Sequence, residues 1–382
     1  MSTHPLTLLP TPTARDLSGL ISPTFHTLIV QPTTLCNLDC AYCYLPDRKR
    51  QALMSPLVAE VCAASIHDQA SAYPVDVVWH GGEPTATPIA HLRALLAPFE
   101  TLRAEGRVRH GIQTNATLIN EAWCELFAEH DFEVGVSVDG PAWANRDRLD
   151  WAGKESFDRT LHGVASLMEA GIDFTVICVV TPATIDRVDE LASFFTDIGC
   201  ASVGFNIEEQ EGADRPAIDE HAAYRFWRHL LDRREAGSPL RVRELDRFAD
   251  HIAAARAGTV RRMPFDPIPT VAHDGDTVLL SPELLGIKDA VYGDFLAGNV
   301  LRTPLARMIA DAGRLRYVAE FVDALRTCAS TCAYFSFCGG AQAGNRYFEH
   351  GTFAVAETAY CRNTRQSLVR AAADHLTERN AT

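Results

Sequence analysis

Six short apolar runs alternate with six longer amphipathic stretches between about residue 25 and residue 236, and this alternation restricts the folds open to the chain. Strands that alternate with helices form βα units, whose strands pair in parallel. We therefore expect an α/β protein built on a parallel sheet. The expected strands cover 25–30, 75–80, 108–114, 132–138, 174–180 and 201–207, and the expected helices cover 55–72, 88–104, 120–130, 154–170, 184–198 and 217–236.

The pattern changes near residues 237–239, where Gly, Ser and Pro stand together. Beyond this point come a basic helical stretch, a two-strand signal around Asp274-Gly275, and a tail rich in Cys and Gly. A chain of 382 residues is long enough for two or three domains. We expect an N-terminal extension over 1–24, a first domain over 25–238 and a smaller domain over 239–382.

Three cysteines, Cys36, Cys40 and Cys43, directly follow the first expected strand. Sites in parallel sheets lie at the carboxyl ends of the strands, which is where this triplet stands. A cluster of four irons needs four ligands, so three thiolates leave one iron with an open position for a substrate. The alternatives are a structural zinc knot or three scattered core thiols. The spacing favours the iron–sulfur site.

Polar or glycine residues end the other strands as well. After the second strand stand Gly81, Gly82 and Glu83, where glycines let a ligand approach the backbone and the carboxylate can bond an ammonium group. The third, fourth and sixth strands end in Gln113–Asn115, in Ser137 and in 205–208. Their side chains should line one cavity. We expect His80 to be a buried, hydrogen-bonded histidine and not a metal ligand.

A second group of four cysteines stands in the tail, at Cys328, Cys332, Cys338 and Cys361. Four thiolates form a closed ligand set, typical of structural or electron-transfer sites. Thiolates suit zinc and iron–sulfur clusters equally, so the residues alone leave both possible. The remaining cysteines are expected to be inert, buried thiols, namely Cys62, Cys124, Cys178 and Cys200.

Composition and charge exclude several classes of protein. The net charge of −14 argues against a nucleic-acid substrate, because such proteins usually carry a basic surplus. No apolar run approaches the length of about 20 residues that spans a bilayer. The first ten residues lack the basic and apolar regions of a signal peptide. We therefore expect a cytoplasmic protein whose 11 cysteines stay reduced.

The C-x3-C-x2-C triplet, with aromatic Tyr42 before its last cysteine, resembles the cluster loop of the radical S-adenosylmethionine (SAM) enzymes. The run at 81–84 is similar to the Gly-Gly-Glu-Pro motif that holds the amino group of SAM in that family. The resemblance implies a partial (β/α)6 barrel with SAM completing the 4Fe–4S cluster. It also implies that Ser137 and Arg148 contact the ribose and carboxylate of SAM and that Ile207 packs on its adenine.

The tail resembles the SPASM domain that follows the barrel in peptide-modifying radical SAM enzymes. There a C-x2-C-x5-C group and a later cysteine bind the outer auxiliary cluster; here the first gap is three residues. The inner cluster's cysteine would fall at Gln342, and 271–285 contains no cysteine. The resemblance therefore implies one auxiliary 4Fe–4S cluster, at Cys328, Cys332, Cys338 and Cys361, and not two.

Longer runs resemble the RiPP maturases that form cyclophane crosslinks in ribosomal peptides. They include 43–48, 78–84, 137–141, 204–209 and 281–285. The resemblance implies a ribosomal precursor peptide as substrate and an electron donor such as flavodoxin or ferredoxin. A 5′-deoxyadenosyl radical would take a β-hydrogen, and the carbon radical would bond to an aromatic ring. The auxiliary cluster would accept the electron then released, and Asp139, Glu208 and Glu209 are candidates for the base.

Two other functions remain open at this stage. The first is an anaerobic sulfatase-maturing enzyme that oxidises Cys or Ser to formylglycine, although the missing inner-cluster cysteines weigh against it. The second is a non-catalytic scaffold that holds iron–sulfur clusters or zinc. The intact Gly-Gly-Glu-Pro run at 81–84 weighs against the scaffold, because a carrier has no need of a SAM site.

Overall fold

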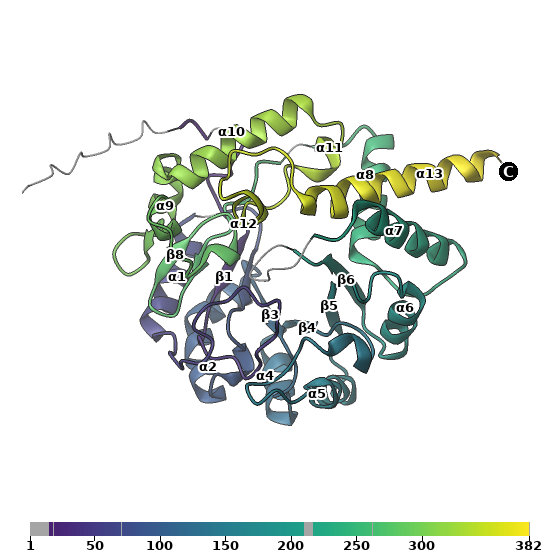
Figure 1. The fold of residues 1–382 in the computed structure, drawn as a ribbon. Helices are drawn as coiled ribbons and strands as arrows, with labels where there is room; N and C mark the ends of the chain where they lie inside the picture. Colours follow the sequence, from purple (N-terminus) through teal and green to yellow (C-terminus); the bar gives the residue numbers. More distant parts are fainter. Residues whose placement is uncertain (1–14, 18, 70, 210–216, 262, 382) are drawn as a thin grey trace, which may run out of the picture.

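The computed structural model describes residues 15–17, 19–69, 71–209, 217–261 and 263–381. Their strands form one sheet of nine in the order β6-β5-β4-β3-β2-β1-β7-β8-β9 (Figure 1). The strands β1 to β6 pair in parallel with their neighbours, which confirms the expected α/β class. They are β1 Thr27–Val30, β2 Val75–Trp79, β3 Val108–Thr114, β4 Glu133–Ser137, β5 Phe174–Val180 and β6 Ser202–Ile207.

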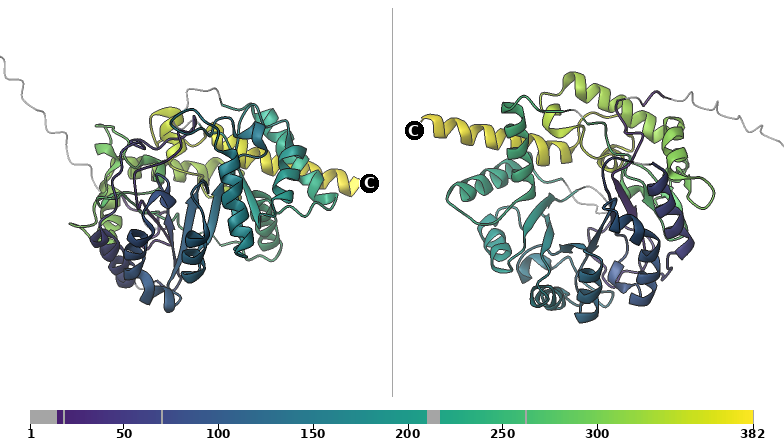
Figure 2. Two further views of the ribbon diagram at one scale, coloured as in Figure 1. Left: turned by 90° about the horizontal axis from the view of Figure 1, so that it is seen from below. Right: turned by 180° about the vertical axis from the view of Figure 1, so that it is seen from behind.

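Helices cover the outer side of the curved sheet, and the strands line its inner side (Figures 1 and 2). The expected helix over 88–104 is interrupted, because Pro98 lacks an amide hydrogen and stands in a 3-10 turn at Ala97–Phe99. The other expected helices agree with the observed ones to within a few residues. The helices are α1 Pro56–Gln69, α2 Ile89–Leu96, α3 Glu100–Ala104, α4 Glu121–Glu129, α5 Phe157–Glu169, α6 Val188–Asp197 and α7 Glu220–Glu235.

The C-terminal residues continue the same sheet. Strand β7 (Thr270–Val271) pairs in parallel with β1, and β8 (Asp276–Val278) and β9 (Gly298–Asn299) follow in antiparallel order. The turn between β7 and β8 contains Gly275 at a φ of +92°, which agrees with the expected two-strand signal. The later helices are α8 Arg243–Arg256, α9 Leu305–Asp311, α10 Arg316–Thr331, α11 Phe335–Cys338, α12 Gly344–His350 and α13 Ser367–Ala381.

The three expected domains are in extensive contact. One hydrophobic cluster contains residues from both sides of 238, such as Val30 and Val271, and α13 packs along α7. The described part of the N-terminal extension lies on the C-terminal residues, since Arg15 N donates to Gly313 O and Ser22 N to Phe265 O. The boundaries 1–24, 25–238 and 239–382 therefore stay a prediction.

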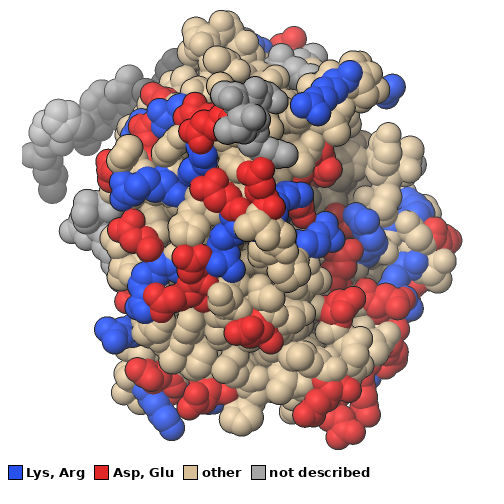
Figure 3. Space-filling model, turned by 90° about the vertical axis from the view of Figure 1, so that its right-hand side faces the viewer, with Lys and Arg blue, Asp and Glu red and all other residues tan. Residues whose placement is uncertain are grey.

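Basic and acidic side chains are interspersed on the face that Figure 3 shows. Basic residues of α7 pair with acidic residues beside it, as in Arg225–Asp186 at 3.3 Å and Arg233–Asp189 at 2.5 Å. Exposed pairs of this kind contribute little to stability. Within the described ranges, no helix combines the length and the apolarity that crossing a membrane requires.

The packing of α5 depends on Gly163. Its Cα faces Ala116, which follows β3 and has a φ of +61°. A Cβ at position 163 would lie 2.0 Å from the Ala116 carbonyl oxygen. The absent side chain thus allows α5 to lie directly on the segment that follows β3, and so to hold the end of this strand in place.

We expect Gly163→Ala to destabilise the protein by about 1–3 kcal/mol, because the collision involves backbone and cannot relax by a change of rotamer. Helix propensity alone predicts the opposite sign, a gain of about 1 kcal/mol. Chemical denaturation followed by circular dichroism measures the difference. Glu169→Ala, at an exposed position of the same helix, is the control and should change little. Stabilisation by Gly163→Ala would contradict this view of the packing.

Candidate active site and thiolate pocket

A cavity of about 300 Å³ lies at the carboxyl ends of β1 to β6. The three cysteines of the loop after β1 line it together with the residues expected to bind SAM. The members of this expected set that line the cavity are Cys36, Cys40, Cys43, Tyr42, Gly82, Glu83, Ser137, Arg148 and Ile207; Gly81 is the one expected residue that does not line it.

Gly82 holds the cysteine loop against the end of β2. It has a φ of +62°, and a Cβ here would lie 2.6 Å from Thr33 O and 2.7 Å from Leu35 O. The next amide, Glu83 N, donates to Leu35 O at 2.7 Å. Close approach of a ligand is thus not needed to explain a glycine at 82, since the backbone of the protein itself occupies that space.

The Glu83 carboxylate joins the ends of β2 and β3. It is 2% exposed. Its Oε1 accepts from Thr85 N at 3.0 Å, Thr85 Oγ1 at 2.6 Å and Thr114 Oγ1 at 2.6 Å, and its Oε2 accepts from Asn115 N at 2.8 Å. A carboxylate offers about four acceptor sites, so Oε1 is saturated. Oε2 keeps capacity for one further donor, such as an ammonium group.

A buried triad lies beneath the cysteine loop. Tyr42 Oη donates to Asp139 Oδ2 at 2.5 Å, and Arg148 Nη1 donates to Tyr42 Oη at 2.6 Å. Burial raises the pKa of Tyr42 and of Asp139, although Arg148 acts in the opposite direction on both. Asp139 Oδ1 also accepts from Val179 N at 3.0 Å. With both oxygens bonded, Asp139 fixes Tyr42 and Arg148 and is poorly placed to serve as the base.

Other strand ends contribute polar side chains to the cavity. Gln113 Nε2 donates to Ser137 Oγ at 2.8 Å, and Glu208 and Glu209 lie at the end of β6. His80 is half-buried, and its Nε2 lies 3.0 Å from Tyr44 Oη. Burial lowers the pKa of His80 to about 4. It is hydrogen-bonded as expected, but it also lines the cavity, which the sequence analysis did not anticipate.

Pro282 and Glu283 line the cavity from the C-terminal part of the chain. The Ser281 hydroxyl donates to Glu283 Oε2, and Gly344 N at the start of α12 donates to Ser281 Oγ at 3.2 Å. Burial raises the pKa of Glu283. Glu283 was not among the residues expected in the site. Its signals in the sequence were an acidic residue within the mostly apolar 278–285 run and the resemblance of 281–285 to the RiPP maturases.

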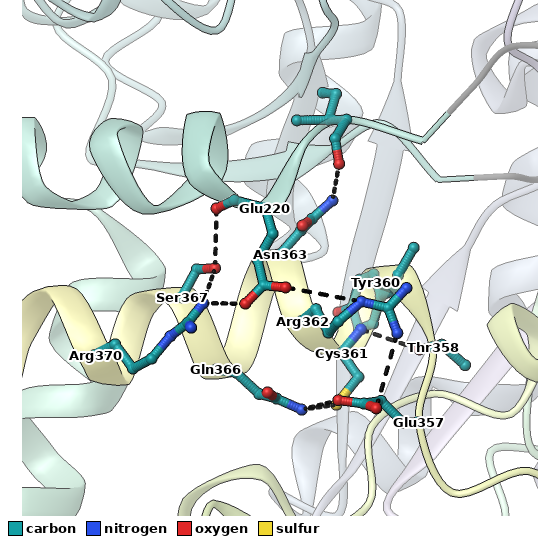
Figure 4. A network of polar contacts seen from close by, with 12 residues as sticks. Glu220, Glu357, Thr358, Tyr360, Cys361, Arg362, Asn363, Gln366, Ser367 and Arg370 are labelled. Carbon is teal, nitrogen blue, oxygen red and sulfur yellow. Dashed lines mark hydrogen bonds and ion pairs between the residues drawn. The ribbon is translucent and has the colours of Figure 1, made fainter.

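The four C-terminal cysteines line a second, smaller pocket together with Arg346. They come from α10, from the turn before α11, from α11 and from the π-helical turn Cys361–Gln366. Figure 4 shows how Cys361 is held: its amide donates to Thr358 Oγ1 at 3.0 Å, and Gln366 Nε2 lies 3.5 Å from its sulfur. Arg370 of α13 pairs with Glu220 of α7, which anchors this segment to the barrel.

The donor sets of both pockets fit iron–sulfur clusters. Each consists of thiolates, and the second faces the buried guanidinium of Arg346, whose Nη1 has no hydrogen-bond partner among the described residues. Buried positive charge suits an anionic cluster. Within the described ranges no three His, Cys, Asp or Glu side chains are close enough together to hold a single metal ion, so the fit rests on the type of donor and on the pocket that each set of cysteines shares.

The remaining cysteines lie apart from both pockets. Cys62, Cys124 and Cys178 are buried, as expected, while Cys200 is half-buried. Burial raises the pKa of Cys62 to about 12 and that of Cys200 to about 11. Thiols with such raised pKa values are unreactive at neutral pH.

Comparison with known proteins identifies the superfamily to which the chain belongs. The model of the radical SAM superfamily matches residues 30–195. An uncharacterized protein of Synechocystis sp., sll1766, is 34% identical over 350 residues, 88% of each chain. The serine-type anaerobic sulfatase-maturating enzyme of Klebsiella pneumoniae is 32% identical over 197 residues, which cover 50% of this chain and only 49% of that protein.

The chain belongs to the radical SAM superfamily and is an enzyme of that superfamily. Membership implies SAM and a 4Fe–4S cluster, and it disfavours the non-catalytic scaffold. The structure of anSMEcpe with bound AdoMet has the same fold, at a TM-score of 0.75 and 20% identity over 94% of each chain. Streptococcus suis SuiB bound to precursor peptide SuiA is also similar, at a TM-score of 0.56 and 19% identity over 75% of this chain and 64% of that one.

We expect Gly82→Ala to displace the cysteine loop, because the new Cβ would collide with two backbone carbonyls. SAM cleavage should fall about 100-fold, the usual cost of a displacement near 1 Å at a reacting centre. The loss of 5′-deoxyadenosine, measured by chromatography, tests this. Gly106→Ala is the matched control, since Gly106 has a similar φ of +70° but nothing within 4 Å. Equal activities of the two variants would contradict the steric argument.

Proposed function

We propose that this radical SAM enzyme modifies a ribosomal precursor peptide and forms a cyclophane crosslink between an aromatic ring carbon and a β-carbon. The observation that carries the proposal is the cavity in which the cysteine triplet, Arg148 and several carboxylates face one space. Two similar proteins, anSMEcpe and SuiB, have been solved with bound peptides, which supports a peptide substrate.

In this proposal each cavity residue has a defined task. Cys36, Cys40 and Cys43 would hold the 4Fe–4S cluster, and Gly82, Glu83, Ser137, Arg148 and Ile207 would bind and orient SAM, with Tyr42 fixing Arg148. Gly81, which does not line the cavity, would contribute to the SAM site through its neighbours. With SAM bound and the cluster reduced by a donor such as flavodoxin or ferredoxin, SAM and the cluster together would supply a 5′-deoxyadenosyl radical that removes a hydrogen from the peptide. The protein's own contribution is orientation and exclusion of water.

Ring closure also needs an acceptor for one electron and one for a proton. We assign the electron to an auxiliary 4Fe–4S cluster at Cys328, Cys332, Cys338 and Cys361. For the proton, Asp139 has both oxygens bonded, and in this proposal the remaining capacity of Glu83 Oε2 serves the ammonium group of SAM. Glu283 lines the cavity, its one described side-chain partner is a hydroxyl, and burial raises its pKa, so we assign it as the general base.

A second candidate is a sulfatase-maturing oxidation of Cys or Ser to formylglycine. It is favoured by the identity of about 30% to the Klebsiella sulfatase-maturating enzymes and by the fold shared with anSMEcpe. The two reactions differ in their products. A crosslink removes two hydrogens and joins an aromatic residue to its neighbour, whereas formylglycine formation leaves the aromatic residues unchanged and, from Cys, removes sulfur.

The testing experiment is anaerobic reconstitution of the full chain, followed by iron, sulfide and zinc analysis and a SAM-cleavage assay with aromatic-containing peptides. We expect about eight irons per chain, 5′-deoxyadenosine, and a peptide that has lost two hydrogens with its aromatic ring linked to a β-carbon. About four irons together with zinc would remove the proposed electron acceptor. Formylglycine in place of a crosslink would establish the second candidate and overturn the first.

We expect Glu283→Gln to lower the rate of crosslinking by about 100-fold or more, the usual contribution of a general base. Hydrogen abstraction precedes the deprotonation, so 5′-deoxyadenosine should still form and the two activities should separate. Glu209→Gln, another cavity carboxylate, is the matched control. If Glu209→Gln uncouples the two activities and Glu283→Gln does not, the assignment of the base is wrong.

A further inference from the structure

Arg346 of α12 is a buried cation without an acidic partner. Its side chain is 2% exposed, and none of the described carboxylates pairs with it. Its Nη2 donates to Gly340 O at 2.8 Å and lies 3.7 Å from Cys328 Sγ, while the guanidinium stacks 4.6 Å from the centre of the Phe321 ring. Its Nη1 is buried and has no hydrogen-bond partner in the described part of the chain.

Such an arrangement is costly unless negative charge lies close by. An uncompensated buried charge destabilises a protein by several kcal/mol. Burial lowers the pKa of Arg346, and the nearby thiols of Cys328, Cys338 and Cys361 raise it. The orphaned Nη1 and the sulfur contact together indicate that this guanidinium serves the four-thiolate pocket.

We propose that Arg346 tunes the auxiliary cluster, raising its reduction potential so that the cluster can accept the electron released on ring closure. The proposal rests on the function proposed above. After the carbon–carbon bond forms, the substrate radical would lose one electron to the oxidised cluster held by the four cysteines and one proton to the base. A fixed cation in a low-dielectric site stabilises added negative charge. Arg346 would therefore stabilise the reduced cluster, which carries one more negative charge, more than the oxidised cluster.

The position of α12 supports a role in electron transfer. Asn345, next to Arg346 in the chain, donates from Nδ2 to Glu209 Oε2 of the active-site cavity. Gly344 N, one residue earlier, donates to Ser281, which in turn donates to Glu283. Three successive residues of α12 therefore contact the cavity carboxylate of Glu209, the Ser281 hydroxyl that bonds Glu283, and a cysteine of the thiolate pocket.

Redox titration of the reconstituted full-length protein, followed by electron paramagnetic resonance, tests the proposal without any peptide. Arg346→Gln should shift the midpoint of the auxiliary cluster to a more negative potential, while the SAM-binding cluster keeps its own. Arg346→Lys retains the charge and should give a smaller shift. Arg326→Gln removes an exposed arginine from the helix that carries Cys328 and is the control for net charge.

An unchanged auxiliary potential in Arg346→Gln, with about eight irons retained, overturns the proposal. If Arg346→Gln loses the auxiliary irons, Arg346→His decides: at pH 9, where an imidazole is neutral, a potential equal to that of the unmodified protein overturns it. If only the crosslinking proposal is wrong, the potential of the auxiliary cluster still shifts in Arg346→Gln but no crosslinked peptide forms. The two failures can therefore be distinguished. Zinc in place of iron at this pocket would overturn both the tuning role and the electron acceptor.

Discussion

The contact between the end of β2 and the cysteine loop is the constraint on which the rest of the site depends. Gly82 lies so close to the carbonyls of Thr33 and Leu35 that no side chain fits between them. Glu83 then bonds backward to that loop through its amide and sideways to Thr114 and Asn115 through its carboxylate. Three strand ends are thereby held together, so the three cysteines face a cavity of fixed shape.

The second organising element is α12, which lies between the two pockets. Its residues contact Glu209 and the Ser281–Glu283 pair in the reaction cavity and Cys328 in the thiolate pocket. A substrate radical that must lose both a proton and an electron needs acceptors for each within reach. In the function proposed above, Glu283 and the auxiliary cluster would be these acceptors, and residues of α12 contact the Ser281 partner of Glu283 and the cluster ligand Cys328.

Much of the fold could be predicted because short strand-sized runs alternate along the chain with longer amphipathic stretches, as βα units require. Val108–Thr114 and Phe174–Val180 have the expected bounds. The expected helix over 88–104 was wrong in its middle, where amphipathic spacing continues through Pro98 although its missing amide hydrogen ends the helix. The cysteine triplet and its neighbours at strand ends were predictable from spacing and from the rule that strand ends gather at one edge.

The sequence by itself therefore determined the class of fold, the cluster loop and the set of polar strand ends, because local spacing and the period of apolar residues encode them. Only the tertiary structure showed that Glu283 enters the cavity and that Arg346 reaches the thiolates, since each meets partners distant in the chain, as between Arg346 and Cys328. The tertiary structure also gives a different reason for a glycine at position 82. The spacing suggested room for a ligand, whereas the close approach of Thr33 and Leu35 makes the glycine a requirement of the protein's own packing.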